Sequence, residues 1–265
     1  MNIKKIGSIL SFVVSFFFLI PMEAQTLVYT PEKNVHSHND YMQNVPFYTA
    51  YSARCASIEA DIFLRNGELL VAHEEKDIKN IRTLKALYLD PIRKEMSLNG
   101  GSGYPDGNGF QLMIDFKDDT KSTLKVLVKQ LSEYQKCFDV SKNPAAVRVV
   151  ISGYVLNPDE FKNYPSFISF DGFPNVCYTE EQSKRVPQIS LSFEDLSHWN
   201  GVGELPHADY LKVKVTVDSI HALGKAARFW ETPDTEDAWR TFIQLGVDFL
   251  NTDHPNKIAD FLLNL

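Results

Sequence analysis

The sequence predicts an α/β protein, and within that class a single (β/α)8 TIM barrel. Short apolar runs alternate with helical patterns about eight times along the chain, and this alternation is typical of parallel strands that are joined by helices. The length of 265 residues suits one such barrel, which takes about 250 residues. Two helical patterns end at a glycine, Gly224 or Gly246, as helices commonly do.

The first predicted segment is a secretory signal peptide that covers residues 1–24. Two lysines near the start precede an uncharged apolar run over residues 6–20, and a short Pro-Met-Glu-Ala sequence ends at Ala24. This order of basic, apolar and small-residue regions is that of a signal peptide. A membrane anchor is the competing interpretation, but the run is shorter than the roughly 20 residues of a span. We expect an exported protein, periplasmic or secreted, whose mature chain has no transmembrane span.

Residues 25–265 are predicted to form one barrel domain. An extra strand over residues 68–73 is expected to pair as a hairpin with the second barrel strand, because Asn66-Gly67 favours a tight hairpin turn. The clearest helical patterns cover residues 120–134, 210–223 and 235–245. The eight barrel strands are expected at residues 34–36, 57–63, 110–116, 147–152, 167–170, 188–192, 226–230 and 247–251.

A glycine-rich segment at residues 99–109 leads from a helix into the third barrel strand. Loops of this kind lie on the face of a barrel opposite the active site. We therefore interpret the segment as a surface loop and not as a lid.

Composition limits the classes of partner. The net charge of −7 and the pI near 5.5 argue against nucleic acid, because phosphate binding needs a basic surface. Cys55, Cys137 and Cys177 are too few and too far apart for a disulfide framework or a zinc knuckle, so we expect them to be buried small apolar residues. We expect a monomer that acts on a small-molecule or lipid substrate.

Four predicted strands end in chemically useful residues two positions apart. Residues i and i+2 of a strand share one face, and catalytic groups in this fold gather at the carboxyl ends of strands. One such pair is weak support for a site, whereas four pairs at the same end of four strands are much stronger. The pairs are His36 and His38, Glu59 and Asp61, Asp115 and Lys117, and Arg228 and Trp230.

The acidic residues predict a metal site. Burying Glu59 and Asp61 side by side costs several kcal/mol unless a cation neutralises them. Asp115 supplies a third carboxylate from the next apolar run, and an all-oxygen site suits Mg²⁺ or Ca²⁺ better than zinc. Lys117 lies on the same face as Asp115 and is expected to pair with that carboxylate or with a substrate phosphate.

His36 and His73 are the candidate proton-transfer residues. Histidine can accept or donate a proton near neutral pH because its pKa lies close to that range. His36 ends the first strand, and His73 follows the apolar run of the hairpin strand. Which of the two is the acid and which is the base stays open.

In this order the motifs resemble those of the glycerophosphodiester phosphodiesterase and phosphatidylinositol-phospholipase-C-like barrel superfamily. That group has a histidine at the end of the first strand, a Glu-x-Asp pair at the end of the second, and a histidine after the hairpin. It also has a third acid before a lysine, and a Thr-Asp-x-Pro stretch near the end of the chain. The matching residues here are His36, Glu59-Ala60-Asp61, His73-Glu74, Asp115-Phe116-Lys117, Trp230, Gly246-Val247-Asp248 and Thr252-Asp253-His254-Pro255.

Two features separate the chain from typical glycerophosphodiesterases. Ser37 and His38 replace the usual arginine and glycine, and Asp115 replaces the usual glutamate. Asp115 and the spacing of His36 and Asn39 resemble the sphingomyelinase D branch. The strings at residues 36–41 and 228–234 are most similar to the subfamily of the fungal altered-inheritance-of-mitochondria proteins.

The resemblance implies a metal-dependent phosphodiesterase that cleaves a glycerophosphodiester or a phospholipid-type phosphodiester. Its implied catalytic residues are His36 and His73, and its implied metal ligands are Glu59, Asp61 and Asp115. The residues expected to bind substrate are His38, Asn39, Lys117, Arg228 and Trp230.

Two other functions stay open. His36-Ser37-His38 is also the metal-binding pattern of amidohydrolases and of polymerase-and-histidinol-phosphatase-type phosphoesterases, although those sites draw further histidines from later strands. The strands at residues 147–152, 167–170 and 188–192 end without any. The second alternative is a non-catalytic barrel that binds a lipid or sugar phosphate.

Overall fold

The computed structural model describes residues 28–154 and 156–265, so the expected signal peptide lies outside the described residues. The predicted barrel strands are all present within a few residues of their expected bounds. Neighbouring barrel strands are parallel. Their bounds are β1 Val35–Ser37, β2 Ser57–Arg65, β4 Gln111–Phe116, β5 Arg148–Gly153, β6 Ile168–Phe170, β7 Gln188–Ser192, β8 Ala226–Trp230 and β9 Leu250–Thr252.

The strands follow one another around a ring. Six of them pair in the order β6-β5-β4-β2-β1-β9, and β7 pairs with β8. Single parallel bridges join the two groups, Gly172 with Ile189 on one side and Arg228 with Phe249 on the other. The predicted TIM-barrel fold class is therefore confirmed, with narrow contacts at these two seams.

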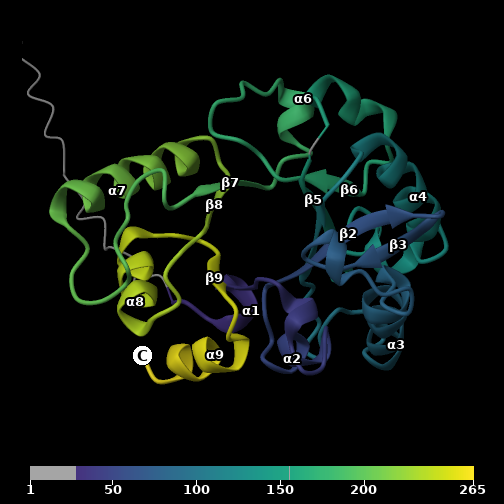
Figure 1. Ribbon diagram of the computed structural model, residues 1–265, viewed down its shortest axis with the longest axis horizontal. Coiled ribbons are helices and arrows are strands. Elements are labelled where there is room, and N and C mark those ends of the chain that lie inside the picture. Colours follow the sequence, from purple (N-terminus) through teal and green to yellow (C-terminus); the bar gives the residue numbers. More distant parts are fainter. Residues whose placement is uncertain (1–27, 155) are drawn as a thin grey trace, which may run out of the picture.

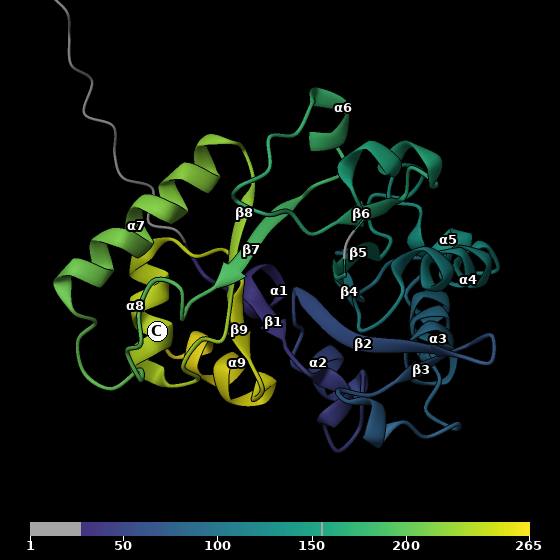
Figure 2. The same cartoon turned by 45° about the horizontal axis from the view of Figure 1, so that its top comes forward.

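Strand β3, Glu68–Val71, lies outside the ring and pairs antiparallel with the end of β2. Asn66 and Gly67 both have positive φ angles, 52° and 82°, which a tight two-residue hairpin turn requires. Figure 2 shows β2 extending away from the other barrel strands to meet β3. The hairpin returns the chain to the carboxyl end of the barrel, and the amide of Ala72 donates to the carbonyl of Asp61.

Helices surround the strands, with α7, α8 and α9 on one side and α3 and α4 on the other (Figure 1). The α-helices are α1 Pro31–Asn34, α2 Tyr48–Ser52, α3 Asp90–Leu98, α4 Thr120–Ser132, α5 Gln135–Phe138, α6 Glu180–Ser183, α7 His207–Ala222, α8 Glu236–Leu245 and α9 Pro255–Leu263. Shorter or irregular turns are η1 Asp40–Met42, η2 Glu75–Asp77, η3 Lys85–Leu89 and η4 Pro158–Asn163.

Strand β2 shows how the sequence separates core from site. Its alternate residues Ile58, Ala60 and Ile62 are fully buried in the hydrophobic core. Glu59 and Asp61 lie on the other face of the strand and are buried among polar side chains. A period of two thus sends apolar residues into the core and acids into the ring.

The start of the last strand differs from expectation. The last strand begins at Leu250 and not at residue 247, because the amides of Asp248 and Phe249 both donate to the carbonyl of Ala227, which interrupts the regular ladder. The segment 99–109 is anchored to the barrel, since Tyr104 is buried and its hydroxyl donates to the carbonyl of Cys55.

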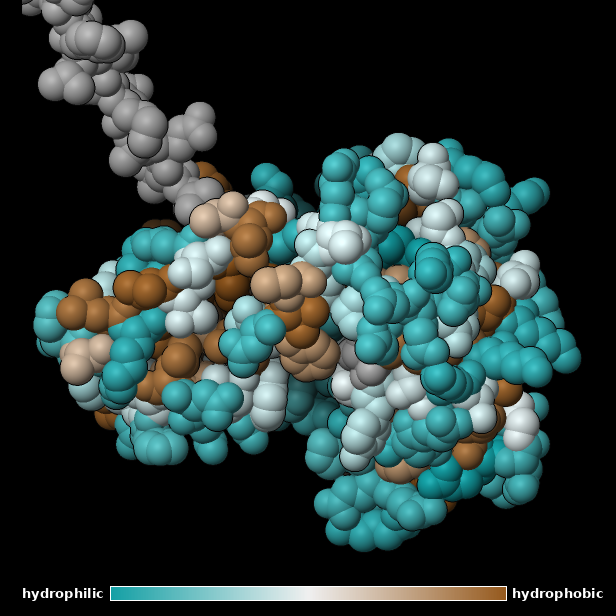
Figure 3. All heavy atoms as spheres, turned by 90° about the horizontal axis from the view of Figure 1, so that it is seen from above, coloured by the Kyte–Doolittle hydropathy of each residue, from teal (hydrophilic) through white to brown (hydrophobic). Residues whose placement is uncertain are grey.

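Helix α7 has apolar residues on its outer face as well as on its inner face. Val213, Val217 and Ile220 are buried against the barrel, whereas Leu211 and Val215 are exposed. In Figure 3, apolar residues gather on the side of the molecule that carries α7. Among the helices of residues 28–265, none combines the length and the hydropathy that crossing a bilayer demands.

Candidate active site

Strand register brings the predicted acids together. In the parallel pairing of β2 with β4, Asp61 lies directly beside Asp115. The ammonium of Lys117 joins them, with Nζ 3.0 Å from Asp61 Oδ2 and 2.9 Å from Asp115 Oδ1. Burial lowers the pKa of Lys117, but the two carboxylates outweigh it and hold that pKa above its usual range. The hydroxyl of Ser152 donates to the other oxygen of Asp115, at 2.8 Å.

Glu59 is buried and held by two donors. Nε2 of His36 lies 2.6 Å from Glu59 Oε2, and Nη2 of Arg228 lies 3.0 Å from the same oxygen. Arg228 also donates to Oδ1 of Asn251, at 2.9 Å. Burial raises the pKa of Glu59, but the guanidinium of Arg228 and the hydrogen bond from His36 hold it well below its usual range. Glu59 is therefore a carboxylate in this arrangement.

His36 lies at the bottom of the site, fully buried. Burial, followed by the charge of Arg228, lowers the pKa of His36 to about 4, so the ring is neutral at neutral pH. With Nε2 donating to Glu59, Nδ1 accepts from the hydroxyl of Ser57, at 2.8 Å. The partners of the two ring nitrogens thus fix the tautomer of His36.

His73 is the accessible histidine, since about half of its side chain is exposed. Its Nδ1 lies 3.1 Å from Asp61 Oδ2. With Nδ1 donating to this carboxylate, Nε2 carries the free lone pair. The hydroxyl of Tyr41 lies between the same groups, 2.7 Å from Asp61 Oδ2, 2.6 Å from Asn39 Oδ1 and 3.1 Å from His73 Nδ1.

The charge of Asp61 is compensated only in part. Its Oδ1 is buried and has no hydrogen-bond partner within the described part of the chain. Burial, then the charges of Glu59 and Asp115, raise the pKa of Asp61 to about 7, although Lys117 opposes this rise. A carboxylate in this position favours any additional cation that can reach it.

These observations fit a divalent cation. Glu59, Asp61 and Asp115 offer oxygen ligands, which Mg²⁺ and Ca²⁺ prefer, and Asp61 Oδ1, which has no hydrogen-bond partner among the described residues, could be one of them. Across residues 28–154 and 156–265, no three His, Cys, Asp or Glu side chains already have a geometry that would hold an ion. Instead, Lys117 pairs with Asp61 and Asp115, and Arg228 pairs with Glu59.

The residues predicted to bind substrate lie around this centre. Nδ1 of His38 is 2.8 Å from Asp253 Oδ1, and the amide of Asn39 is 3.0 Å from the same ring nitrogen. Burial lowers the pKa of His38, but the hydrogen bond with Asp253 and the negative charges of Glu59 and Asp253 together leave that pKa raised. Trp230 ends β8 two residues after Arg228, and 40% of it is exposed.

Sequence reasoning missed a buried polar chain below the site. From Ser57, which contacts His36, hydrogen bonds run through Gln111 and Gln188 to Ser190, and from there to Asp171. These side chains come from β2, β4 and β7 and from the end of β6, and all are buried. The only signal in the sequence was a glutamine at the start of two apolar strands. Tyr41 was also missed, although it belongs to the string His36–Tyr41.

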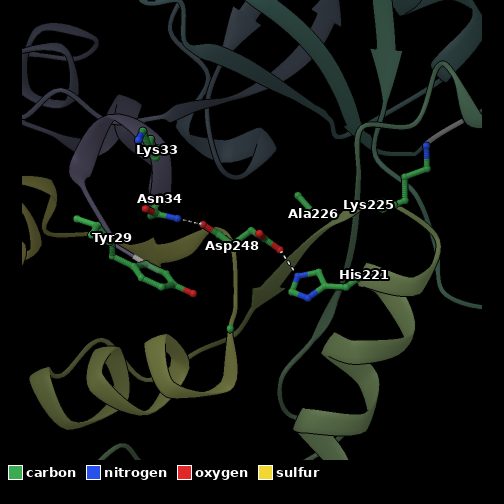
Figure 4. Close-up of a pocket in the computed structure, with 10 residues that line it drawn as sticks. Tyr29, Lys33, Asn34, His221, Lys225, Ala226 and Asp248 are labelled. Carbon is green, nitrogen blue, oxygen red and sulfur yellow. Dashed lines mark hydrogen bonds and ion pairs between the residues drawn. The ribbon is translucent and has the colours of Figure 1, made fainter. Parts of the chain in front are cut away.

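A sizeable cavity lies at the opposite end of the barrel. It has a volume of about 840 Å³ and opens where β8 begins and where the chain enters β1 and β9. Tyr29, Asn34, His221 and Asp248 line it, and Nε2 of His221 is 2.7 Å from Asp248 Oδ2 (Figure 4). None of the predicted site residues lines this cavity.

Solved structures share the fold. A glycerophosphodiester phosphodiesterase from Parabacteroides distasonis matches with a TM-score of 0.52 and 13% identity, over 88% of this chain and 97% of that one. A calcium-dependent phosphoinositol-specific phospholipase C from a Pseudomonas species matches with a TM-score of 0.54 and 13% identity, over 88% and 93%.

Sequence comparisons define the family. Residues 28–102 match the model of the AIM6-like phosphodiesterase domain, and residues 226–256 match that of the glycerophosphoryl diester phosphodiesterase family. An altered inheritance of mitochondria protein 6 homolog from Arthroderma benhamiae is 30% identical, over 86% of this chain and 83% of the relative. Altered inheritance of mitochondria protein 6 from Eremothecium gossypii is 27% identical, over 86% and 69%. The chain therefore belongs to the AIM6-like phosphodiesterase family.

Proposed function

We propose that this phosphodiesterase is an exported, metal-dependent enzyme that cleaves a glycerophosphodiester or a phospholipid-type phosphodiester by histidine acid–base catalysis. Family and fold support a phosphodiester hydrolase of the glycerophosphodiesterase type. The further details rest on the residues around Asp61. The proposal of export rests on the sequence of residues 1–24. To test it, the protein is recovered from outside the cytoplasm and its mass is measured. Cleavage after Ala24 would lower this mass by that of residues 1–24.

One observation carries the proposal. Asp61 and Asp115 lie side by side, share one ammonium, and leave a buried carboxylate oxygen that no group in residues 28–154 or 156–265 contacts by a hydrogen bond. Glu59 lies two residues before Asp61 on the same face of β2. Three neighbouring carboxylates, two of them buried, are costly unless cations neutralise them; Lys117 and Arg228 supply two positive charges, and a divalent cation would supply more.

Glu59, Asp61 and Asp115 would hold Mg²⁺ or Ca²⁺, which would neutralise charge on a non-bridging phosphate oxygen. Lys117 and Arg228 add two positive charges to the same cluster. A phosphodiester carries one negative charge, so these side chains would orient its phosphate.

His73 suits the role of general base. It is partly exposed, and the hydrogen bond between its Nδ1 and Asp61 leaves the Nε2 lone pair free to accept a proton. The nucleophile would be water or a neighbouring hydroxyl of the substrate. His36 is the second proton-transfer group of this proposal, and its proton would pass to the leaving oxygen from Nε2, which donates to Glu59 in the present arrangement. His38, Asn39 and Trp230 would contact the remainder of the substrate.

The test is turnover of a chromogenic phosphodiester and of glycerophosphodiesters, with EDTA and after addition of Mg²⁺ or Ca²⁺. We expect EDTA to abolish activity and one of the two ions to restore it. His73→Ala should lower kcat at least about 100-fold, the usual scale for removing an acid–base group, and Asp61→Asn and Asp115→Asn, which remove expected metal ligands, should also lower kcat. Circular dichroism checks that each variant remains folded.

Matched controls make the same kinds of change, acid to amide and histidine to alanine, at positions away from the site. The controls are Glu133→Gln and His207→Ala. Glu133 directly follows α4, His207 is the first residue of α7, and both side chains are exposed. These variants should keep full activity. Wild-type rates in the folded Asp61→Asn and His73→Ala variants, or full activity in EDTA, would contradict the proposal. Stoichiometric zinc in the active protein would instead favour the hydrolase class that uses a His-x-His pair.

A further inference from the structure

Large apolar side chains are exposed on several separate segments around the candidate active site. In a barrel of this type, the segments that follow the strands form the face that carries the site. Exposed apolar residues of this size lie in the segments after β1, β3, β6 and β7 and at the end of β8. We call this set the apolar rim: Met42, Val45, Ile81, Phe173, Val202 and Trp230.

One part of the rim adjoins His73 and Asp61. The guanidinium of Arg82, beside Ile81, donates to the carbonyl of Tyr41, beside Met42. The hydroxyl of the same Tyr41 contacts Asp61 and His73. Ile81 is the most exposed residue of the rim, at 84%.

The other part of the rim adjoins Arg228. Trp230 ends the strand that carries Arg228. Val202 lies on a segment that is tied to the residues after Trp230, because the hydroxyl of Thr235 donates to the carbonyl of Gly201. The rim therefore flanks the site on more than one side and is built from segments distant in sequence.

The distribution of the rim residues indicates what kind of surface could cover them. A peptide or a helix in a groove would cover residues from one or two neighbouring elements. The rim residues come from five segments around the ring, so a partner that covers them together presents a broad apolar surface. A layer of lipid is such a surface, and exposed apolar and aromatic side chains gain free energy by entering it.

Charge on the Trp230 side of the rim indicates the kind of lipid. The segments 193–206 and 231–235, which flank Trp230 and include Val202, contain no lysine or arginine. They carry the exposed acids Glu194, Asp195 and Glu204. Anionic lipids would be repelled by these carboxylates, whereas the ammonium groups of zwitterionic phospholipids complement them.

We infer that the apolar rim docks on a zwitterionic phospholipid surface, and that the enzyme cleaves a phosphodiester presented in that surface. This inference rests on the proposed function for the reaction, but the docking itself does not depend on turnover. The acidic segments beside the rim set the preference for lipids without net negative charge.

The experiment is flotation of the purified protein with phosphatidylcholine vesicles and with vesicles that contain phosphatidylserine. The rim variant is Ile81→Ser, Phe173→Ser and Val202→Ser combined, since these exposed side chains lie outside the proposed catalytic and substrate-binding groups. The matched control is Leu211→Ser and Val215→Ser on the exposed face of α7. Turnover of a soluble chromogenic phosphodiester is measured for all proteins.

We expect the wild type and the α7 control to bind phosphatidylcholine vesicles, and the rim variant to bind at least about tenfold more weakly, since it loses apolar area from the contact. Its turnover of the soluble diester should be unchanged, whereas its turnover of diester lipid in vesicles should fall. The inference is overturned if the wild-type protein does not bind phosphatidylcholine vesicles, or if it binds vesicles that contain phosphatidylserine more strongly. Loss of binding in the α7 control alone also overturns it, whereas absent turnover with intact binding counts only against the proposed reaction.

Discussion

The substitution Arg228→Met tests whether the guanidinium of Arg228 neutralises Glu59 in the centre of the barrel. The side chain of Arg228 is 5% exposed, that of Glu59 is 6% exposed, and their contact distance is 3.0 Å. Methionine fills a similar volume but removes the charge, so Glu59 keeps only the hydrogen bond from His36. Breaking a buried ion pair from one side costs about 3–5 kcal/mol. Nε of Arg228 is itself buried without a partner among the described residues, and its removal offsets part of this cost. We therefore expect the free energy of unfolding to fall by about 3 kcal/mol, the low end of the range.

The assay is urea unfolding at pH 7, followed by tryptophan fluorescence and circular dichroism. Arg148→Met is the matched control, because Arg148 is exposed at the start of β5, and its free energy of unfolding should change by less than about 0.5 kcal/mol. A free energy of unfolding for Arg228→Met within about 1 kcal/mol of the wild type would refute the idea that this guanidinium neutralises a buried Glu59.

Two further predictions concern the neighbourhood of the site. Gly153→Ala should destabilise the protein by more than about 1 kcal/mol and weaken its response to Mg²⁺ or Ca²⁺ in thermal unfolding, because Gly153 has φ 74° and an added Cβ would lie 2.8 Å from Asp115 Oδ1. Gly203→Ala, which also has positive φ but open space around it, separates backbone strain from the clash. Burial raises the pKa of Asp171 to about 6, so the folded state keeps a proton that the unfolded state releases near pH 4. Stability from this group is therefore lost as pH rises from about 4 to 6, and the difference in unfolding free energy between wild type and Asp171→Asn should vary with pH over that window. A constant difference would contradict the raised pKa.

Much of the fold could be predicted because its signals are local. Apolar runs separated by helical patterns located the strands, and Asn66-Gly67 located the hairpin through a turn that only such residues adopt readily. The start of the last strand was less predictable. The carbonyl of Ala227 accepts from two successive amides there, which is a contact between distant segments and leaves no pattern in residues 247–251.

The proposed site could be predicted in part, and for a physical reason. Residues i and i+2 of one strand share a face whatever the surroundings, so the pairing of Glu59 with Asp61 follows from the strand alone. The positions of Lys117 between two carboxylates and of Arg228 on Glu59 depend on register between strands. Tyr41 and the buried chain from Ser57 to Asp171 depend on which side chains meet across the ring.

The sequence by itself determined the fold class, the family and the residue types of the site, because periodicity and motif order are properties of the chain. The tertiary structure decided which charges meet. It left one oxygen of Asp61 buried without a partner among the described residues, exposed His73 and buried His36. It also arranged apolar side chains from five segments around one end of the barrel. These features arise from packing between segments far apart in sequence, where burial and neighbouring charge set the chemistry of each group.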